Sequence, residues 1–211
     1  TRLQVSGSCL DVLQRCISWI DISLVANSQA IAILLNAIDT RHKWQCTPAC
    51  ECFRQMVLKG MPLDKKIALL EQLQLEGMLT ALVLGPKPFQ DEGKEEDADG
   101  FTWRLASLTS TLWEQLMSAC KDLEGTENGN LRQVCQHHLS ALFPVLTFFA
   151  QHASEEVAYK ALPTIGLYVN FLRTNERACD AHQMSSLLQV VYQRLHHKAG
   201  ECGEGFQEDD D

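Results

Sequence analysis

Apolar residues recur along most of the chain at the three-to-four-residue spacing of an amphipathic α-helix, and the alternation typical of a β-strand is almost absent. The first run repeats at Leu10, Leu13 and Ile17, and turn residues separate such runs. Gly60 stands where one helix would end, and Pro62 stands where the next would begin. The pattern therefore predicts an all-α protein.

The same spacing predicts eight helices grouped into four consecutive hairpins. The predicted pairs are 9–20 with 28–39, 46–59 with 62–76, 101–123 with 131–150, and 155–172 with 181–197. A single hairpin cannot bury its apolar face alone, so neighbouring hairpins must stack. The predicted fold is an α-α superhelix, a HEAT-like solenoid with two hairpins in residues 1–89 and two in residues 101–200.

Local signals refine these helices. Asn27 or Ser28 is expected to be the N-cap of the second one. Pro48 is placed for a helix start, whereas Pro144 and Pro163 fall inside helical patterns. An interior proline removes a backbone hydrogen bond, so these two helices should be kinked, or alternatively divided into shorter ones.

Two acidic stretches carry the excess charge of the chain. The formal net charge is −9, with −5 in residues 90–100 and −6 in residues 201–211, so the helical body is close to neutral. Gly85-Pro86-Lys87-Pro88 cannot be helical. We therefore expect residues 90–100 to be a solvated loop insertion and residues 201–211 to be a second acidic loop or linker.

The cysteines favour a reducing compartment. Nine are present, an odd number, and most lie in apolar helical patterns, where a free thiol packs as a small apolar side chain. These are Cys9, Cys16, Cys120, Cys135 and Cys179. No basic and apolar leader opens the chain, and its apolar stretches are too short for a bilayer, so no membrane insertion is expected. The start at Thr1 suggests an excerpt of a longer protein.

Two motifs in the first half of the chain carry a family resemblance. One is Ser18-Trp19-Ile20-Asp21-Ile22-Ser23-Leu24-Val25-Ala26-Asn27, and the other is Ala49-Cys50-Glu51-Cys52-Phe53, which continues to Lys59-Gly60-Met61 and Asp64-Lys65. Both resemble the exportin-t family, the karyopherin-β receptors that carry tRNA out of the nucleus. The resemblance is strongest over residues 9–77, and the later half matches mainly in helix order.

This resemblance implies a HEAT-repeat segment of a nuclear export receptor. Such a receptor binds Ran in its GTP form together with tRNA, crosses the pore by way of nuclear pore proteins, and unloads when Ran hydrolyses GTP. It therefore shuttles between nucleus and cytoplasm. A karyopherin for another cargo, or a HEAT scaffold outside transport, would have the same fold.

Within that reading, cations on the second helix of each hairpin would face the concave wall of the solenoid. There they could touch tRNA phosphates or Ran, although each could also be an ordinary solvated side chain. The candidates are Lys65, Lys66, Arg132, Arg194 and Lys198. The acidic stretches could meet a basic patch on Ran or steer tRNA, or they could be simple linkers. Their candidate residues are Asp91, Glu92, Glu95, Glu96, Glu208, Asp209, Asp210 and Asp211.

Other chemistry finds little support in the sequence. His42, Cys46, Cys50 and Cys52 suggest zinc, but an α-helix turns Cys52 about 200° away from Cys50, so a packed helix is predicted instead. Neither a nucleophile motif nor a phosphate-binding Gly-rich loop is present. We expect that the protein is not an enzyme and that it has no catalytic residue, bound metal or cofactor. Most of the four tryptophans are expected to pack in helical faces rather than stack on bases.

Overall fold

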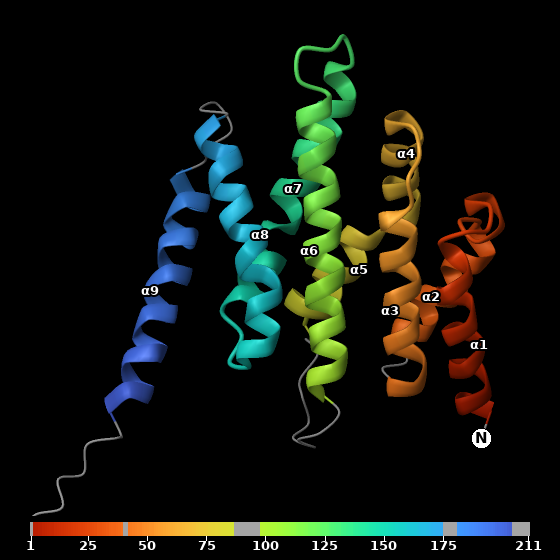
Figure 1. Cartoon of the computed structure of the whole chain (residues 1–211), viewed down its shortest axis with the longest axis horizontal. Helices are drawn as coiled ribbons and strands as arrows, with labels where there is room; N and C mark the ends of the chain where they lie inside the picture. Colours follow the sequence, from red (N-terminus) through yellow and green to blue (C-terminus); the bar gives the residue numbers. More distant parts are fainter. Residues whose placement is uncertain (1, 40–41, 87–97, 175–180, 204–211) are drawn as a thin grey trace, which may run out of the picture.

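The computed structural model describes residues 2–39, 42–86, 98–174 and 181–203. Over these residues it contains helices and no strand, arranged as a stack seen side-on in Figure 1. One row consists of α1 (Arg2–Ile17), α3 (Lys43–Leu58), α6 (Ala98–Asp122) and α8 (Glu155–Thr174), each packed against the next. The predicted all-α fold of stacked hairpins is confirmed.

Further helices lie behind this row (Figure 1). They include α2 (Ser28–Asp39), which packs on α3, and α5 (Leu75–Leu84), which packs on α7 (Gly129–Ala150). The helix α7 fits against both α6 and α8, and α9 (Ala181–Gly203) packs on α7. Successive neighbours thus share one continuous apolar core, as stacked hairpins require.

The second predicted hairpin differs in its return helix. This helix does not end near Gly77 but is divided into α4 (Leu63–Leu73) and α5 by Gln74, which has a left-handed backbone (φ 53°, ψ 28°). The axes of α4 and α5 differ by 41°. Apolar burial continues through α5 at Leu79 and Leu82, which explains why the helix runs on to Leu84.

The proline predictions have mixed outcomes. The helix α3 begins at Lys43, so Pro48 lies inside it rather than at its start. Pro144 and Pro163 lie within α7 and α8, each of which is one uninterrupted helix, so the alternative of two shorter helices is wrong. The helix α6 begins at Ala98, inside the stretch expected to be loop, and residues 87–97 lie outside the described structure.

The N-cap prediction for α2 is confirmed. The backbone N–H of Ala30 donates to the side-chain oxygen Oδ1 of Asn27 at 2.9 Å. That bond satisfies one of the amide groups that a helix N-terminus leaves without a partner. Between α1 and α2, Asp21 similarly caps the short 3₁₀ helix Ile22–Leu24 by accepting from the N–H of Ser23 at 2.9 Å.

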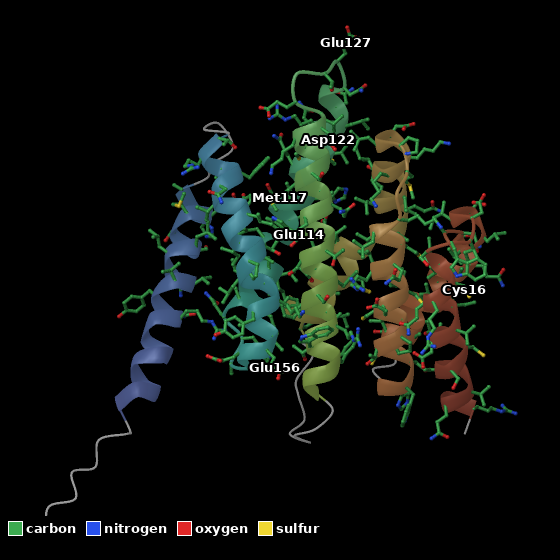
Figure 2. The ribbon with its side chains drawn as sticks, viewed as in Figure 1. Cys16, Glu114, Met117, Asp122, Glu127 and Glu156 are labelled. Carbon is green, nitrogen blue, oxygen red and sulfur yellow. The ribbon has the colours of Figure 1, made fainter. Side chains whose placement is uncertain are left out.

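Cysteine and tryptophan burial was only partly predicted. Cys120 and Cys135 are buried, but Cys9 is exposed and Cys16, labelled in Figure 2, is half-buried. Cys179 lies outside the described residues. Trp113 is fully buried and Trp103 packs against the core, whereas Trp19 and Trp44 are 73% and 53% exposed. Two of the four tryptophans therefore pack in the core, so the expectation that most of them would is wrong.

No single helix in the described ranges is long and apolar enough to cross a bilayer. Only α4 and α5 together reach that length and composition, and they are bent at Gln74. In the fold, Ile67, Leu73 and Leu79 of this pair are buried in the common core.

The backbones of α1 and α3 approach each other closely at Gly7. A Cβ atom there would lie 2.1 Å from the carbonyl oxygen of Trp44. We expect Gly7→Ala to force α1 outward and to lower the free energy of unfolding by about 1 kcal/mol, after the gain in helix propensity is subtracted.

The matched control is Gly166→Ala, in α8, where a Cβ would meet nothing within 4 Å. It should stabilise the protein by about 0.5–1 kcal/mol, because alanine is the better helix former. Urea unfolding of both variants measures the two effects. Stabilisation by both substitutions would show that the helices are not in such close contact at Gly7.

Candidate functional site

The two adjacent lysines predicted to face a ligand point in different directions. Lys65 is exposed on α4, whereas Lys66 is only 7% exposed. The Nζ of Lys66 donates to the carbonyl oxygens of Val57 and, at 2.8 Å, Lys59. Neighbours on an α-helix point about 100° apart, so one inward and one outward side chain is the expected geometry. Lys66 is therefore an internal contact rather than a surface cation.

Lys66 binds the end of the preceding helix. The four last carbonyls of an α-helix have no partner within it, and a cation there also meets the negative end of the helix dipole. Burial removes water from this ammonium group and lowers the pKa of Lys66 from 10.5 to about 8. The amino group can donate to the same two carbonyls in either protonation state.

Arg194, another basic candidate, also binds carbonyl groups at the C-terminal end of a helix. Its Nε donates to the carbonyl oxygen of Ala150 at 2.8 Å, and its Nη2 donates to that of His152. Ala150 is the last residue of α7, so the half-buried guanidinium joins α9 to the C-terminus of α7. Its hydrogen bonds are made within the protein.

Sequence reasoning missed a third cation of this kind. The Nζ of Lys59 donates to the carbonyl oxygens of Ile17 at 2.8 Å and Ser18 at 3.2 Å, and also to that of Ile20. These carbonyls close α1, so Lys59 joins the end of α3 to the end of α1. A lysine before a glycine at a helix end was visible in the sequence, but its acceptors lie about forty residues earlier in the chain.

This contact connects the two motifs that carry the family resemblance. Ile20 and Ser18 belong to the first motif, and Lys59 belongs to the second. The lysine and the turn that it binds therefore form one structural unit between the first two helices of the row.

The remaining basic candidates are less completely described. Arg132 is half-buried, and its Nη2 lies 3.7 Å from the carboxylate oxygen Oε1 of Glu124. Lys198 belongs to α9, but its side chain lies outside the described part of the structure. The predicted acidic candidates lie outside it as well; they are Asp91, Glu92, Glu95, Glu96, Glu208, Asp209, Asp210 and Asp211.

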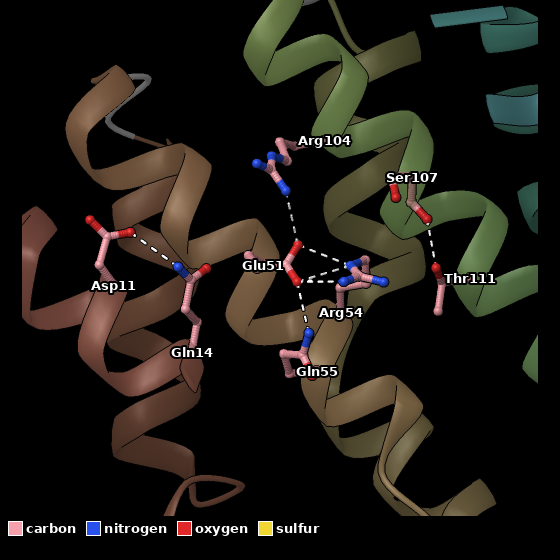
Figure 3. Close-up of polar contacts among 8 residues, drawn as sticks. All are labelled: Asp11, Gln14, Glu51, Arg54, Gln55, Arg104, Ser107 and Thr111. Atoms are coloured by element: carbon pink, nitrogen blue, oxygen red, sulfur yellow. Dashed lines mark hydrogen bonds and ion pairs between the residues drawn. The ribbon is translucent and has the colours of Figure 1, made fainter. Parts of the chain in front are cut away.

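Polar contacts also join the front row between its helices. Glu51 on α3 accepts hydrogen bonds from Arg54 and Gln55 and from Arg104 of α6 (Figure 3). Burial acts to raise the pKa of this carboxyl, but the hydrogen bonds and charges of the arginines outweigh it and hold the pKa below its usual range. Farther along, Thr164 of α8 donates to Glu114 of α6 at 2.9 Å (Figure 2).

The cysteine-rich helix α3 is packed as predicted. Cys46, Cys50 and Cys52 are buried, whereas His42 is exposed. Burial raises the pKa of the Cys52 thiol to about 12, and its Sγ donates to the carbonyl oxygen of Leu10 at 3.6 Å. Across the ranges with described coordinates, no group of three or more His, Cys, Asp or Glu residues could hold a metal ion.

Comparison with known proteins gives consistent matches. A family model described as Exportin 1-like protein matches residues 3–53. Exportin-T of Homo sapiens is 27% identical over 176 residues, covering 82% of this chain and 17% of that protein. Exportin-T of Mycosarcoma maydis is 23% identical over 205 residues, covering 92% and 18%. Exportin-T of Dictyostelium discoideum is 22% identical over 209 residues, covering 96% and 17%.

The stacked helices define the class: this chain is a helical-repeat segment, and its residues 3–53 are similar to the Exportin 1-like family. The Exportin-T relatives confirm the more particular resemblance drawn from the two motifs, because they are similar to the chain over most of its length. The chain spans 17–18% of the length of these three relatives.

Proposed function

We propose that this chain is part of a nuclear export receptor that binds tRNA cooperatively with Ran in its GTP form. The receptor would carry tRNA through the nuclear pore, by way of pore proteins, and shuttle between nucleus and cytoplasm. The similarity to Exportin-T over 82–96% of the chain supports this proposal. GTP hydrolysis would be carried out by Ran, so the chain has no catalytic role in it.

The stacked architecture suits such a receptor. Each helix of the front row touches mainly its neighbours, so small rotations between successive helices can add up to a large change in curvature. If tRNA and Ran-GTP favour the same curvature, each ligand raises the affinity of the other. In this proposal residues 1–89 and 101–200 each contribute two hairpins, and the acidic stretches 90–100 and 201–211 are candidates for contact with Ran.

Among the basic candidates whose side chains the structure describes, Lys65 is the exposed one, and it is proposed to contact a tRNA phosphate. We expect Lys65→Gln to weaken tRNA binding by the full receptor, and to reduce the steepness of its salt dependence by about one unit of log affinity per log salt concentration. Filter binding at several salt concentrations gives both quantities.

Lys121→Gln is the matched control, because Lys121 is also exposed but lies on α6 in the front row. It should leave both affinity and salt dependence unchanged. Equal salt dependence for Lys65→Gln and the unchanged protein would exclude a phosphate contact by Lys65.

A co-binding assay tests the proposed function as a whole. The full receptor is mixed with labelled tRNA and with Ran loaded with either GTP or GDP, and the complexes are resolved by gel filtration. The proposal expects a complex containing both ligands only with Ran-GTP. Ran-GTP binding without tRNA would favour a karyopherin for another cargo, and binding of neither would favour a HEAT scaffold outside transport.

A further inference from the structure

A groove opens between α2 and α5, on the side of the stack opposite the front row. Its volume is about 700 Å³, within the range of protein ligand sites. Apolar side chains from both helices line it, including Leu35 and Ile38 from α2 and Met78, Ala81 and Leu82 from α5. The polar residues Asn36, Asp39, Gln74 and Glu76, together with Gly77, complete the lining.

The break at Gln74 explains why this groove exists. The 41° change of direction there lets α5 pack against α7, while α2 stays packed on α3. In the described structure α2 does not pack extensively on either α4 or α5. The layer behind the front row is therefore interrupted at this place, and apolar side chains are left facing the gap.

The groove is lined by negative charge. Its ionisable lining residues are Asp39 and Glu76, both acids. Asp39 is exposed and is the last residue of α2, where the helix dipole contributes further negative potential. Glu76 is in contact with Nδ1 of His138 on α7, which holds it at the groove. An occupant should therefore be apolar on one face and positively charged beside it.

We propose that this groove binds a short amphipathic helix of a protein partner. Its apolar residues would lie between α2 and α5, and a Lys or Arg beside them would pair with Asp39. Binding of this kind, an apolar helix face in a hydrophobic groove, needs anchors at about i, i+3 or i+4, and i+7. The occupant would complete the interrupted layer in the way that each neighbouring helix already does.

The same charges argue against two other occupants. The phosphates of a nucleic acid would be repelled by Asp39 and by the C-terminal end of α2. The acidic stretch at residues 90–100 of this chain, with a charge of −5, would meet the same repulsion. The inference goes beyond the proposed function, because it concerns a protein helix as a further ligand and its test needs neither tRNA nor Ran.

Three synthetic peptides of about four helical turns provide the test. The first has leucines at the anchor spacing flanked by lysines, the second replaces each lysine by glutamate, and the third has the first composition in scrambled order. Fluorescence anisotropy measures their binding to the 211-residue chain. We expect the basic amphipathic peptide to bind at least about tenfold more tightly than the other two, a difference of roughly 1.4 kcal/mol.

Two variants locate the site. Ala81→Trp fills the groove with an indole and should weaken binding of the basic peptide about tenfold, a loss of roughly 1.4 kcal/mol. Asp39→Lys reverses the charge at the rim and should shift the preference toward the glutamate peptide. The control is Ala153→Trp, an exposed alanine in the loop after α7, which should bind as the unchanged chain does.

Circular dichroism checks the helical content of each variant, and Asp39→Lys tests the site even if Ala81→Trp fails to fold. Equal binding of the basic and glutamate peptides would overturn the proposal. So would unchanged binding of the basic peptide by both groove variants, or a dissociation constant above about 1 mM for every peptide.

Discussion

Replacing Trp113 by alanine is expected to lower the free energy of unfolding by about 3–5 kcal/mol, the largest effect predicted for any single substitution here. The indole of Trp113 is fully buried in α6. Its ring meets that of Tyr168 on α8 edge-on at 5.1 Å, and it lies 6.2 Å from that of Phe143 on α7. Alanine would leave a cavity where three helices of the stack meet.

The same substitution at Trp19 is the control. Trp19 is 73% exposed, and its indole N–H donates to the carbonyl oxygen of Arg15 within the same turn of chain. Trp19→Ala should therefore change stability by less than about 0.5 kcal/mol. Urea unfolding followed by far-ultraviolet circular dichroism measures both variants. Similar losses in the two would contradict the described position of Trp113 in the core.

Removing the amino group of Lys66 is the second large effect. Lys66→Met keeps an unbranched side chain that ends one atom short of the lysine nitrogen, and it leaves the carbonyls of Val57 and Lys59 without this donor. Leaving a buried acceptor without a partner costs about 1–3 kcal/mol, so a loss of that size is expected. Lys65→Met removes an equivalent amino group in solvent and should change stability by less than about 0.5 kcal/mol.

The Lys66 substitution should also change the pH dependence of stability. The folded protein releases the Lys66 proton near pH 8, whereas an unperturbed lysine keeps it up to about pH 10.5. Between these values the unfolded chain binds more protons than the folded one, so this group makes stability rise with pH. The Lys66→Met variant lacks this rise. The free energy of unfolding that it loses relative to the unchanged protein should therefore be larger at about pH 10 than at about pH 7. An equal cost at both would argue against a buried, readily deprotonated amine.

The helices were predictable because their signal is local. The spacing of Leu10, Leu13 and Ile17, or of the apolar residues in α7 and α8, identifies a helix without any knowledge of its partners. Asn27 was predictable for the same reason, since an N-cap acts within its own turn. Gln74 was not, because nothing in its residue type requires the left-handed backbone that divides α4 from α5.

For the candidate site, the sequence predicted the types of residue involved but not the directions and partners of their side chains. Helix geometry predicts that the side chains of Lys65 and Lys66 point in different directions. Which of the two points inward depends on where the C-terminal end of α3 lies. The roles of Lys59 and Arg194 depend on carbonyls about forty residues away in the chain. The groove arises from the bend at Gln74 and from the packing of α5 on α7, so no local pattern in the sequence indicates it.

The two motifs that carry the resemblance are in direct contact in this structure. Lys59 of one motif binds the carbonyls of Ser18 and Ile20 in the other. These hydrogen bonds are made within the protein, so they are not contacts with a cargo. Ligand contacts are better sought on exposed residues such as Lys65.

The central claim is that this chain belongs to a receptor whose curvature couples two ligands. The most direct test measures tRNA affinity with and without saturating Ran-GTP, and Ran-GTP affinity with and without saturating tRNA, using the full receptor. We expect each ligand to raise the receptor's affinity for the other by the same factor, roughly 5- to 150-fold, and Ran-GDP to have no such effect. Affinities that are unaffected by the second ligand would contradict it.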